Sequence, residues 1–200
     1  MVKYYNKIPK RFEDASFEKS TFGPQFLPAI EYVNNLDKQQ GNLILQGGCG
    51  IGKTHFAYCV VRKFSTYREK WSSGQFCGLY ESEKVLYVTI KEIIDDIRRK
   101  FRGEEPYYDY SKVPLLIVEE IGVQYGTDSE RVELYQVFNQ RWEDLLPTIC
   151  ISNLKKNSSE KKPSLDKILG ARICDRLFDK AVYLEISGGS LRKESETHCG

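Results

Sequence analysis

The sequence predicts an α/β fold, a parallel five-stranded sheet with helices on both faces. Its 200 residues match one α/β domain, long enough to bury a core and short for two domains. Five short apolar runs alternate with segments of helical character, and this alternation calls for parallel strands joined by right-handed crossovers. The run at 113–120 is apolar until its last two residues, as is typical of a strand buried on both sides.

The five expected strands are short apolar runs bounded by glycine, charged or other polar residues. The first stops at a series of glycines, and the third ends in two acids. In chain order they are NLILQ at 42–46, KVLYVTI at 84–90, VPLLIVEE at 113–120, TICIS at 148–152 and AVYLEI at 181–186.

Four helices are expected between these strands. The first runs from about Lys53 into the VVRKFSTY segment at 60–67. The second, KEIIDDIRRKF at 91–101, is amphipathic because its isoleucines recur with helical spacing. The third is DSERVELYQVFNQRWEDL at 128–145, which opens with an Asp-Ser start signal, and the fourth is SLDKILGARICDRLF at 164–178.

The remaining segments are predicted to be irregular and exposed, because they are polar or rich in turn residues. They divide the chain into an N-terminal arm at 1–40, a core at 41–192 and a polar tail at 193–200. The irregular segments are the arm, WSSGQFCGLYESE at 71–83, GEEPYYDYSK at 103–112, KKNSSEKKP at 155–163 and the residues after Arg192.

Composition restricts the possible functions. The 30 Lys and Arg residues against 28 Asp and Glu leave a formal charge of +2, so any nucleic-acid site must be local. No apolar run approaches the roughly 18 residues of a membrane span, which favours a soluble, cytoplasmic protein. The six cysteines have no C-x-x-C spacing, so we expect reduced thiols rather than a metal site.

A glycine-rich segment after the first strand predicts a phosphate-binding loop. Residues Gly47-Gly48-Cys49-Gly50-Ile51-Gly52-Lys53-Thr54 fit G-x-x-x-x-G-K-[ST] between a strand and a helix. In this motif the main-chain N–H groups and the helix N-terminus surround a phosphate. The lysine then reaches the β- and γ-phosphates, and the Thr54 hydroxyl holds Mg²⁺. The alternative is a glycine-rich turn with a surface lysine.

Polar residues also follow two later strands. Glu119 and Glu120 end the most apolar strand, where one acid would coordinate magnesium and the other would activate water. Asn153 follows the strand at 148–152, and its amide would orient the attacking water. The alternatives are an acidic start to a loop and an ordinary Ser-Asn turn.

These three elements, followed by GARICDRLFD at 170–179 and GGSLR at 188–192, resemble the AAA+ ATPases of the DnaC and DnaI helicase loaders and the related IstB transposition ATPases. The resemblance extends from IPKRFEDASF at 8–17 to Arg192. It implies a P-loop NTPase with an AAA+ core and little or no separate lid domain. The expected cofactors are ATP and Mg²⁺, because the N-K-x-D element of GTPases is absent from the sequence.

The resemblance also assigns roles to individual residues. It makes the segment 47–54 the Walker A loop, Glu119 with Glu120 the Walker B pair, and Asn153 the first sensor. It makes Arg176 an arginine finger that acts on a neighbouring subunit, with Arg172 as the less favoured choice. Arg192 is the second sensor, which touches the γ-phosphate.

The expected function is ATP hydrolysis, slow in the monomer, by a protein that assembles as a ring or filament on single-stranded DNA and acts on a replicative helicase or another DNA-remodelling protein. The alternatives are a transposition helper, a small-molecule kinase and a weakly hydrolysing switch. The switch is suggested by Glu119, which is one methylene longer than the usual Asp. A group of basic and aromatic residues near the end of the second expected helix has two interpretations, namely contact with single-stranded DNA through charge and stacking, or an ordinary solvated helix face. The residues are Arg98, Arg99, Lys100, Phe101, Arg102, Tyr107, Tyr108 and Tyr110.

Overall fold

The computed structural model describes residues 2–72, 75–122, 127–157 and 163–189. Its central sheet has five parallel strands in the order β5-β6-β7-β2-β8. This confirms the predicted α/β fold, and each strand falls within a residue or two of its predicted bounds. The strands are β2 (Leu43–Gly47), β5 (Val85–Thr89), β6 (Leu115–Ile121), β7 (Thr148–Ser152) and β8 (Val182–Ile186).

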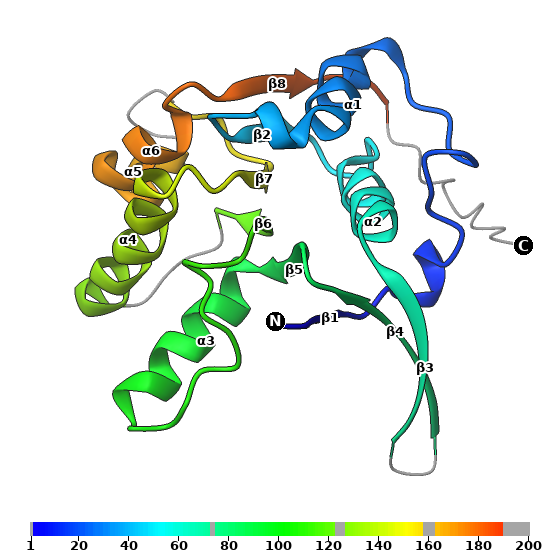
Figure 1. Cartoon of the computed structure of the whole chain (residues 1–200). Helices are drawn as coiled ribbons and strands as arrows, with labels where there is room; N and C mark the ends of the chain where they lie inside the picture. Colours follow the sequence, from blue (N-terminus) through cyan, green and yellow to red (C-terminus); the bar gives the residue numbers. More distant parts are fainter. Residues whose placement is uncertain (1, 73–74, 123–126, 158–162, 190–200) are drawn as a thin grey trace, which may run out of the picture.

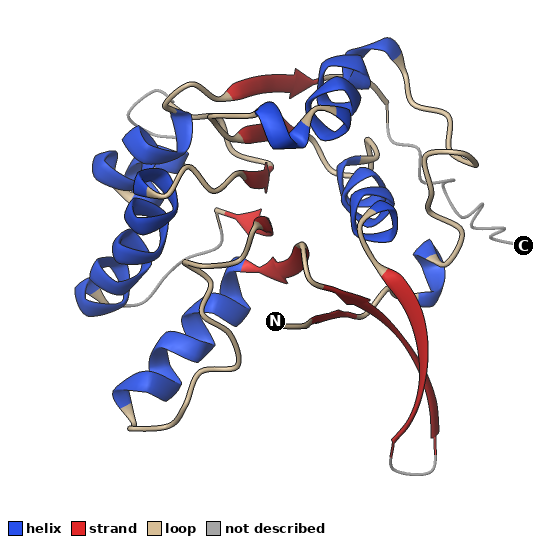
Figure 2. Ribbon diagram, in the orientation of Figure 1, coloured by secondary structure: helices blue, strands red, loops and turns tan. Residues whose placement is uncertain are grey.

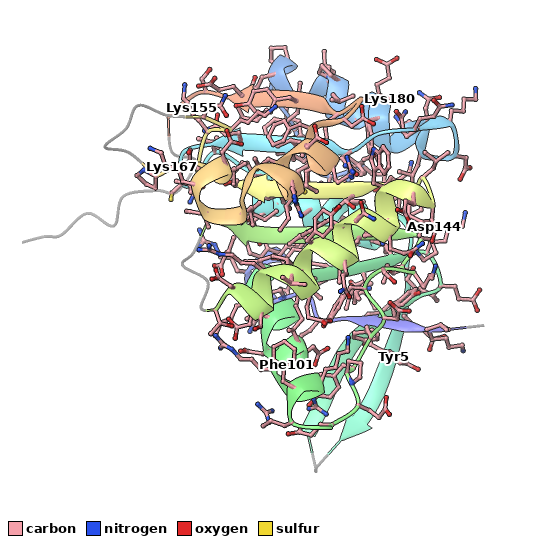
Figure 3. All side chains as sticks on the ribbon, turned by 90° about the vertical axis from the view of Figure 1, so that its left-hand side faces the viewer. Tyr5, Phe101, Asp144, Lys155, Lys167 and Lys180 are labelled. Carbon is pink, nitrogen blue, oxygen red and sulfur yellow. The ribbon has the colours of Figure 1, made fainter. Side chains whose placement is uncertain are left out.

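Helices cover both faces of this sheet, with α1 and α2 on one side and α3 to α6 on the other (Figure 1). Figure 3 views the second side, where α4 runs across the strands. The helices are α1 (Leu27–Asn34), α2 (Lys53–Lys63), α3 (Ile90–Phe101), α4 (Asp128–Glu143), α5 (Leu165–Leu169) and α6 (Ala171–Phe178).

The two faces of the sheet follow directly from the period of two in its strands. In β6, Leu115 and Ile117 pack toward α1 and α2, whereas Leu116 and Val118 pack toward α3 and α4. All four side chains are fully buried. A strand that is apolar on both faces therefore occupies an interior position, where two helical layers remove it from water.

Two helix boundaries differ from the predictions. The segment 164–178 forms two helices instead of one, because Gly170 has φ 90° and ψ 153° and interrupts the helical path. Helix α4 is capped by Thr127 rather than by the Asp-Ser pair, since the Thr127 hydroxyl accepts from the Glu130 backbone N–H and the Glu130 carboxylate accepts from the Thr127 backbone N–H.

The prediction that residues 1–40 are irregular and exposed is wrong. The arm contains β1 (Tyr4–Asn6), three 3₁₀ turns and α1, and it buries Ala15, Phe26 and Val33 completely or nearly so. Asn6 connects it to the sheet, since its amide donates to Val85 O (3.0 Å) and its Oδ1 accepts from the Tyr87 backbone N–H (2.7 Å). The arm is therefore part of the folded core.

A second correction concerns residues 66–82, predicted as a helix end followed by a loop. They form a β-hairpin of β3 (Thr66–Ser72) and β4 (Gln75–Ser82), and β1 pairs with β4 to give an antiparallel sheet in the order β1-β4-β3. The hairpin extends away from the five-stranded sheet, as Figure 2 shows.

The segment 103–112 lacks helix and strand, as predicted, but it is not fully exposed. Tyr110 is buried, and Arg141 of α4 anchors the segment by donating to Tyr110 O (2.9 Å) and Val113 O (2.6 Å). In the described ranges no helix is long and apolar enough to cross a bilayer. The residues after β8 have neither helix nor strand through 189, and Arg192 and the tail lie outside the described residues.

Candidate active site

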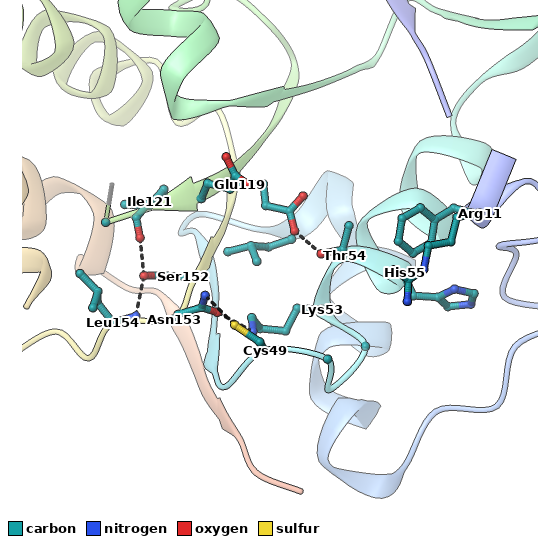
Figure 4. A pocket seen from close by; sticks show the side chains of 16 residues that line it. Arg11, Cys49, Lys53, Thr54, His55, Glu119, Ile121, Ser152, Asn153 and Leu154 are labelled. Atoms are coloured by element: carbon teal, nitrogen blue, oxygen red, sulfur yellow. Dashed lines mark hydrogen bonds between the residues drawn. The ribbon is translucent and has the colours of Figure 1, made fainter. Parts of the chain in front are cut away.

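A cleft of about 600 Å³ opens at the carboxyl ends of β2, β6 and β7 (Figure 4). Loops that follow parallel strands meet at this edge of a sheet, where open α/β folds bind ligands. The lining includes most of the predicted site: Cys49, Gly50, Gly52, Lys53, Thr54, Glu119, Glu120 and Asn153. Residues separated by a hundred positions in the sequence thus share one cavity.

The loop between β2 and α2 has a backbone that only glycine adopts easily. Gly50 and Gly52 have φ values of 80° and 98°, in the left-handed region. A Cβ on Gly47 would lie 2.2 Å from the carbonyl oxygen of Ile186, whereas one on Gly48 would meet nothing within 4 Å. The loop therefore stays close to β8 on one side and leaves space beside the N-terminus of α2 on the other.

Lys53 begins α2 and turns its ammonium group back into this loop. Its Nζ donates to Gly47 O (2.8 Å), Gly48 O (2.7 Å) and Asn153 Oδ1 (3.1 Å). Only 6% of the residue is exposed, and burial lowers the pKa of Lys53. A buried cation held by neutral acceptors alone would gain from an anion, so the loop fits a phosphate group.

Thr54, Glu119 and Tyr87 form a second polar cluster beside the loop. The Thr54 hydroxyl donates to Glu119 Oε1, and the Tyr87 hydroxyl donates to Glu119 Oε2. Burial and the Glu119 charge raise the pKa of Tyr87, which keeps it a hydrogen-bond donor. No group of three or more His, Cys, Asp or Glu side chains in the described residues is arranged to hold a metal.

This donor set fits Mg²⁺ in one specific way. Magnesium prefers oxygen ligands and commonly binds through one or two protein groups together with phosphate oxygens and water. A hydroxyl and a carboxylate next to a phosphate-binding loop supply that arrangement. Thr54 and Glu119 therefore fit their predicted role as Mg²⁺ ligands, with phosphate oxygens as the further ligands.

Glu120 lies at an irregular point of β6. The pairing of β6 with β7 shifts register between Val118 and Ile121, and Glu120 has φ 60°, although it is not glycine. Bulges of this kind redirect a side chain and recur beside active sites, and the left-handed conformation costs about 1–2 kcal/mol. The bulge separates the two acids, so that Glu119 contacts Thr54 while Glu120 is exposed and lines the cleft.

Asn153 follows β7 and crosses to the loop, as the sequence predicted. Its Oδ1 accepts from Lys53 Nζ, and its Nδ2 donates to Cys49 Sγ (3.4 Å). Figure 4 shows this amide between the loop and the end of β7. The amide therefore contacts two residues of the glycine-rich loop, Lys53 and Cys49.

Arg176 does not line the cleft. It belongs to α6, where its guanidinium stacks on the Trp142 ring at 4.2 Å and its Nε donates to Asn139 Oδ1 (2.9 Å). Arg172, one turn earlier, is exposed, and its side chain has no ion pair or hydrogen bond within the described ranges. The structure brings neither arginine to the cleft.

The N-terminal arm contributes lining residues that sequence reasoning missed, namely Arg11 and Phe12. His55, which follows Thr54, forms a 2.7 Å hydrogen bond with Ser20 Oγ and lies 6.2 Å from the Phe12 ring. Burial lowers the pKa of His55. The only sequence signal for these lining residues was the spacing of aromatic residues in the arm. That spacing predicts that the aromatic side chains are buried, but it does not show which part of the protein they pack against.

The basic residues at the end of α3 are paired with acids or rings. This pairing supports the interpretation of this segment as a solvated helix face rather than a DNA-binding site. Phe101 lies at the exposed end of this helix (Figure 3). A site that binds nucleic acid keeps its cationic side chains available for phosphates. The cationic side chains at the end of α3 are instead bound to acids or packed on a ring. The contacts are Arg98 with Glu130 (2.6 Å), Lys100 with Glu133 (2.6 Å), Arg102 with Glu104 (2.7 Å) and Arg99 over the Tyr107 ring (4.0 Å).

Comparison with known proteins places this architecture among ATP-binding proteins. A model of the family described as IstB-like ATP binding protein matches residues 7–199. The replicative helicase loader DnaC of Buchnera aphidicola subsp. Baizongia pistaciae is 26% identical over 190 residues, 92% of this chain and 69% of the relative. The loader DnaC of Escherichia coli K12 is 29% identical over 154 residues, 74% of this chain and 55% of the relative.

Solved structures agree on the fold. A crystal structure of the DnaC helicase loader has a TM-score of 0.67 at 18% identity and covers 90% of this chain and all of its own. A crystal structure of DnaI gives 0.64 at 18% identity, covering 90% and 95%. The P-loop AAA+ core predicted from the motifs is therefore confirmed as a fold. The chain spans between about half and two thirds of the length of the two loaders named above.

Proposed function

Since the chain belongs to the family of IstB-like ATP-binding proteins, we propose that it binds ATP with Mg²⁺ in the cleft and hydrolyses it to ADP and phosphate. One observation carries this proposal. A cation and a hydroxyl from the start of α2, and two acids from the end of β6, one of them strained, line one cavity at the end of a parallel sheet. The phosphate-binding loop alone would support binding; the bulged Glu120 supports hydrolysis.

In this mechanism the chain's own groups position and stabilise the reaction. Lys53 exchanges its carbonyl partners for the β- and γ-phosphate oxygens, and Asn153 orients the attacking water. Glu120 takes a proton from that water as its oxygen bonds to the γ-phosphorus and the bond to ADP breaks. Thr54 and Glu119 would hold Mg²⁺, which would neutralise charge on the phosphates.

The proposal extends to the biological role of a helicase loader. The curated relatives are named replicative helicase loaders, and we propose that this chain likewise acts in the cytoplasm on a replicative helicase, together with single-stranded DNA. The family match also favours a second candidate, a transposition ATPase of the IstB kind. A transposase partner instead of a helicase would identify this second function.

We further propose that full activity requires a homo-oligomer. An arginine supplied by a neighbour is worth about 10³ to 10⁵ in rate in other P-loop enzymes, and head-to-tail contacts of this kind give rings or filaments. Arg172 is the more accessible candidate because Arg176 would first have to leave Trp142 and Asn139. Arg192 is proposed to touch the γ-phosphate.

The decisive experiment measures ATP hydrolysis against protein concentration, with and without single-stranded DNA. The specific rate should rise steeply with concentration, and Glu120→Gln should retain ATP while losing hydrolysis. Lys53→Ala should lose ATP binding, whereas Lys63→Ala, at the opposite end of the same helix, should not. Absence of Mg²⁺-dependent ATP binding in calorimetry would refute the proposal.

The helicase role needs a separate test. The protein is mixed with the replicative helicase of its own source, with ATP, with ADP or without nucleotide, and complexes are separated by size. Binding that depends on ATP supports the loader role, and Arg172→Ala and Arg176→Ala then show which arginine is required. Binding to a transposase with no binding to the helicase would favour the IstB-like role.

A further inference from the structure

We propose that Tyr87 is a positioning residue for the magnesium site, which holds the Glu119 carboxylate so that one of its oxygens is presented beside Thr54. The inference deepens the proposed function and rests on it. No motif in the sequence marks Tyr87, which lies 32 positions before Glu119. The observation behind the inference is that the Glu119 carboxylate accepts a hydrogen bond on each of its two oxygens.

The strand register brings the two residues together. In the β5–β6 pairing Thr89 lies opposite Glu119 and Tyr87 lies opposite Ile117. Alternate residues on a strand share a face, so Tyr87 projects along the same side of the sheet as Glu119. Its hydroxyl reaches Oε2 while the Thr54 hydroxyl occupies Oε1. Each carboxylate oxygen thus has its own donor, from different elements.

The tyrosine is itself rigidly supported. Its backbone N–H donates to Asn6 Oδ1 (2.7 Å), and its ring centroid lies 4.8 Å from that of Tyr58 on α2. A backbone bonded to Asn6 of β1 and a ring packed against Tyr58 of α2 therefore deliver the Tyr87 hydroxyl to a fixed position.

This support explains how Glu119 can act where related ATPases use Asp. The additional methylene gives glutamate one more rotatable bond and hence more positions for its carboxylate. A donor on Oε2 removes much of that freedom, and Oε1 remains for the metal when Thr54 also turns its oxygen toward it. Groups that orient a metal ligand in this way typically contribute a factor of about 10–100 in metal affinity.

The test measures the Mg²⁺ concentration that gives half-maximal tightening of ATP binding, by calorimetry on the full chain without turnover. Tyr87→Phe should raise that concentration about 10–100-fold, with ATP binding in the absence of Mg²⁺ unchanged. Tyr135→Phe is the matched control, because it also removes a hydroxyl donor, to Asn139 Oδ1, but on α4. It should behave as wild type.

A second variant separates positioning from a general structural effect. Glu119→Asp is too short to keep both contacts, so it should weaken the Mg²⁺ dependence by itself, and adding Tyr87→Phe should then change little. If Tyr87→Phe fails to fold, Glu119→Asp alone still tests the inference, because an unchanged Mg²⁺ midpoint would show that the two contacts on the carboxylate do not position it. An unchanged Mg²⁺ midpoint in Tyr87→Phe, or effects of the two variants that multiply fully, would overturn it. Wild-type protein without Mg²⁺-dependent binding would instead refute the proposed function itself.

Discussion

The strained conformation of Glu120 predicts an unusual result, namely that glycine at this position gives a more stable protein than alanine does. The residue has φ 60° at a bulge of β6. Glu120→Gly and Glu120→Ala both remove the carboxylate, but only glycine adopts this conformation without a Cβ clash. The comparison of these two variants therefore isolates the backbone strain from the loss of the side chain.

The magnitude follows from two opposing contributions. A left-handed conformation costs a non-glycine residue about 1–2 kcal/mol, and glycine relieves this cost. Glycine also makes the unfolded chain more disordered, which costs about 0.5–1 kcal/mol relative to alanine. The Gly variant should therefore exceed the Ala variant in unfolding free energy by about 0.5–1 kcal/mol. In a chain of this size that corresponds to roughly 1–4 °C in Tm.

The assay is urea unfolding followed by circular dichroism, with Tm as a second readout. Glu83 provides the control, because it is exposed and its φ is not positive. At that position Glu83→Ala should be more stable than Glu83→Gly, the reverse order. Both Glu120 variants should bind ATP and fail to hydrolyse it. If Glu120→Ala equalled or exceeded Glu120→Gly in stability, the idea of strain at this acid would be wrong.

Three further predictions concern other side chains. A maleimide should modify the exposed Cys49 thiol and thereby block ATP binding in a binding assay. Bound ATP should protect the thiol from modification, and the Cys49→Ser variant should still bind ATP normally after treatment. Arg141→Leu should lower the unfolding free energy in urea by about 2–4 kcal/mol, since it removes donors from Thr148 and from buried carbonyls; an unchanged midpoint would contradict this. Burial lowers the pKa of His55 in the folded state, so the unfolded chain binds more protons as the pH falls below about 6.5. Stability should therefore decline through that range, and His55→Gln should lessen the decline in unfolding curves recorded from pH 7 to pH 5.

The parts of the fold that the sequence predicted are those encoded locally. The run at 113–120 carries its own burial signal, and Gly50 and Gly52 have a backbone conformation that only glycine adopts easily. The hairpin at 66–82 was missed because its strands mix charged and apolar residues, and its pairing with β1 joins residues more than seventy positions apart. Strand pairing over such distances leaves no local pattern.

The candidate site divides in the same way. Lys53, Thr54 and Asn153 were predicted because each directly follows or begins a recognisable element. Tyr87 was not, since its role depends on the register between β5 and β6 and on one hydroxyl contact. The bulge at Glu120 likewise follows from how β6 meets β7, and two consecutive acids give no indication of it.

The burial of several side chains from the first forty residues, among them Ala15, Phe26 and Val33, changes how the chain should be divided for experiments. An expression fragment starting at residue 41 would lack the amide of Asn6 that bridges Val85 and Tyr87. It would also leave the aromatic face of α2 bare, where Phe17, Phe22 and Phe26 surround Phe56. Such a truncated product should precipitate or lose nucleotide, even though every recognisable motif would still be present.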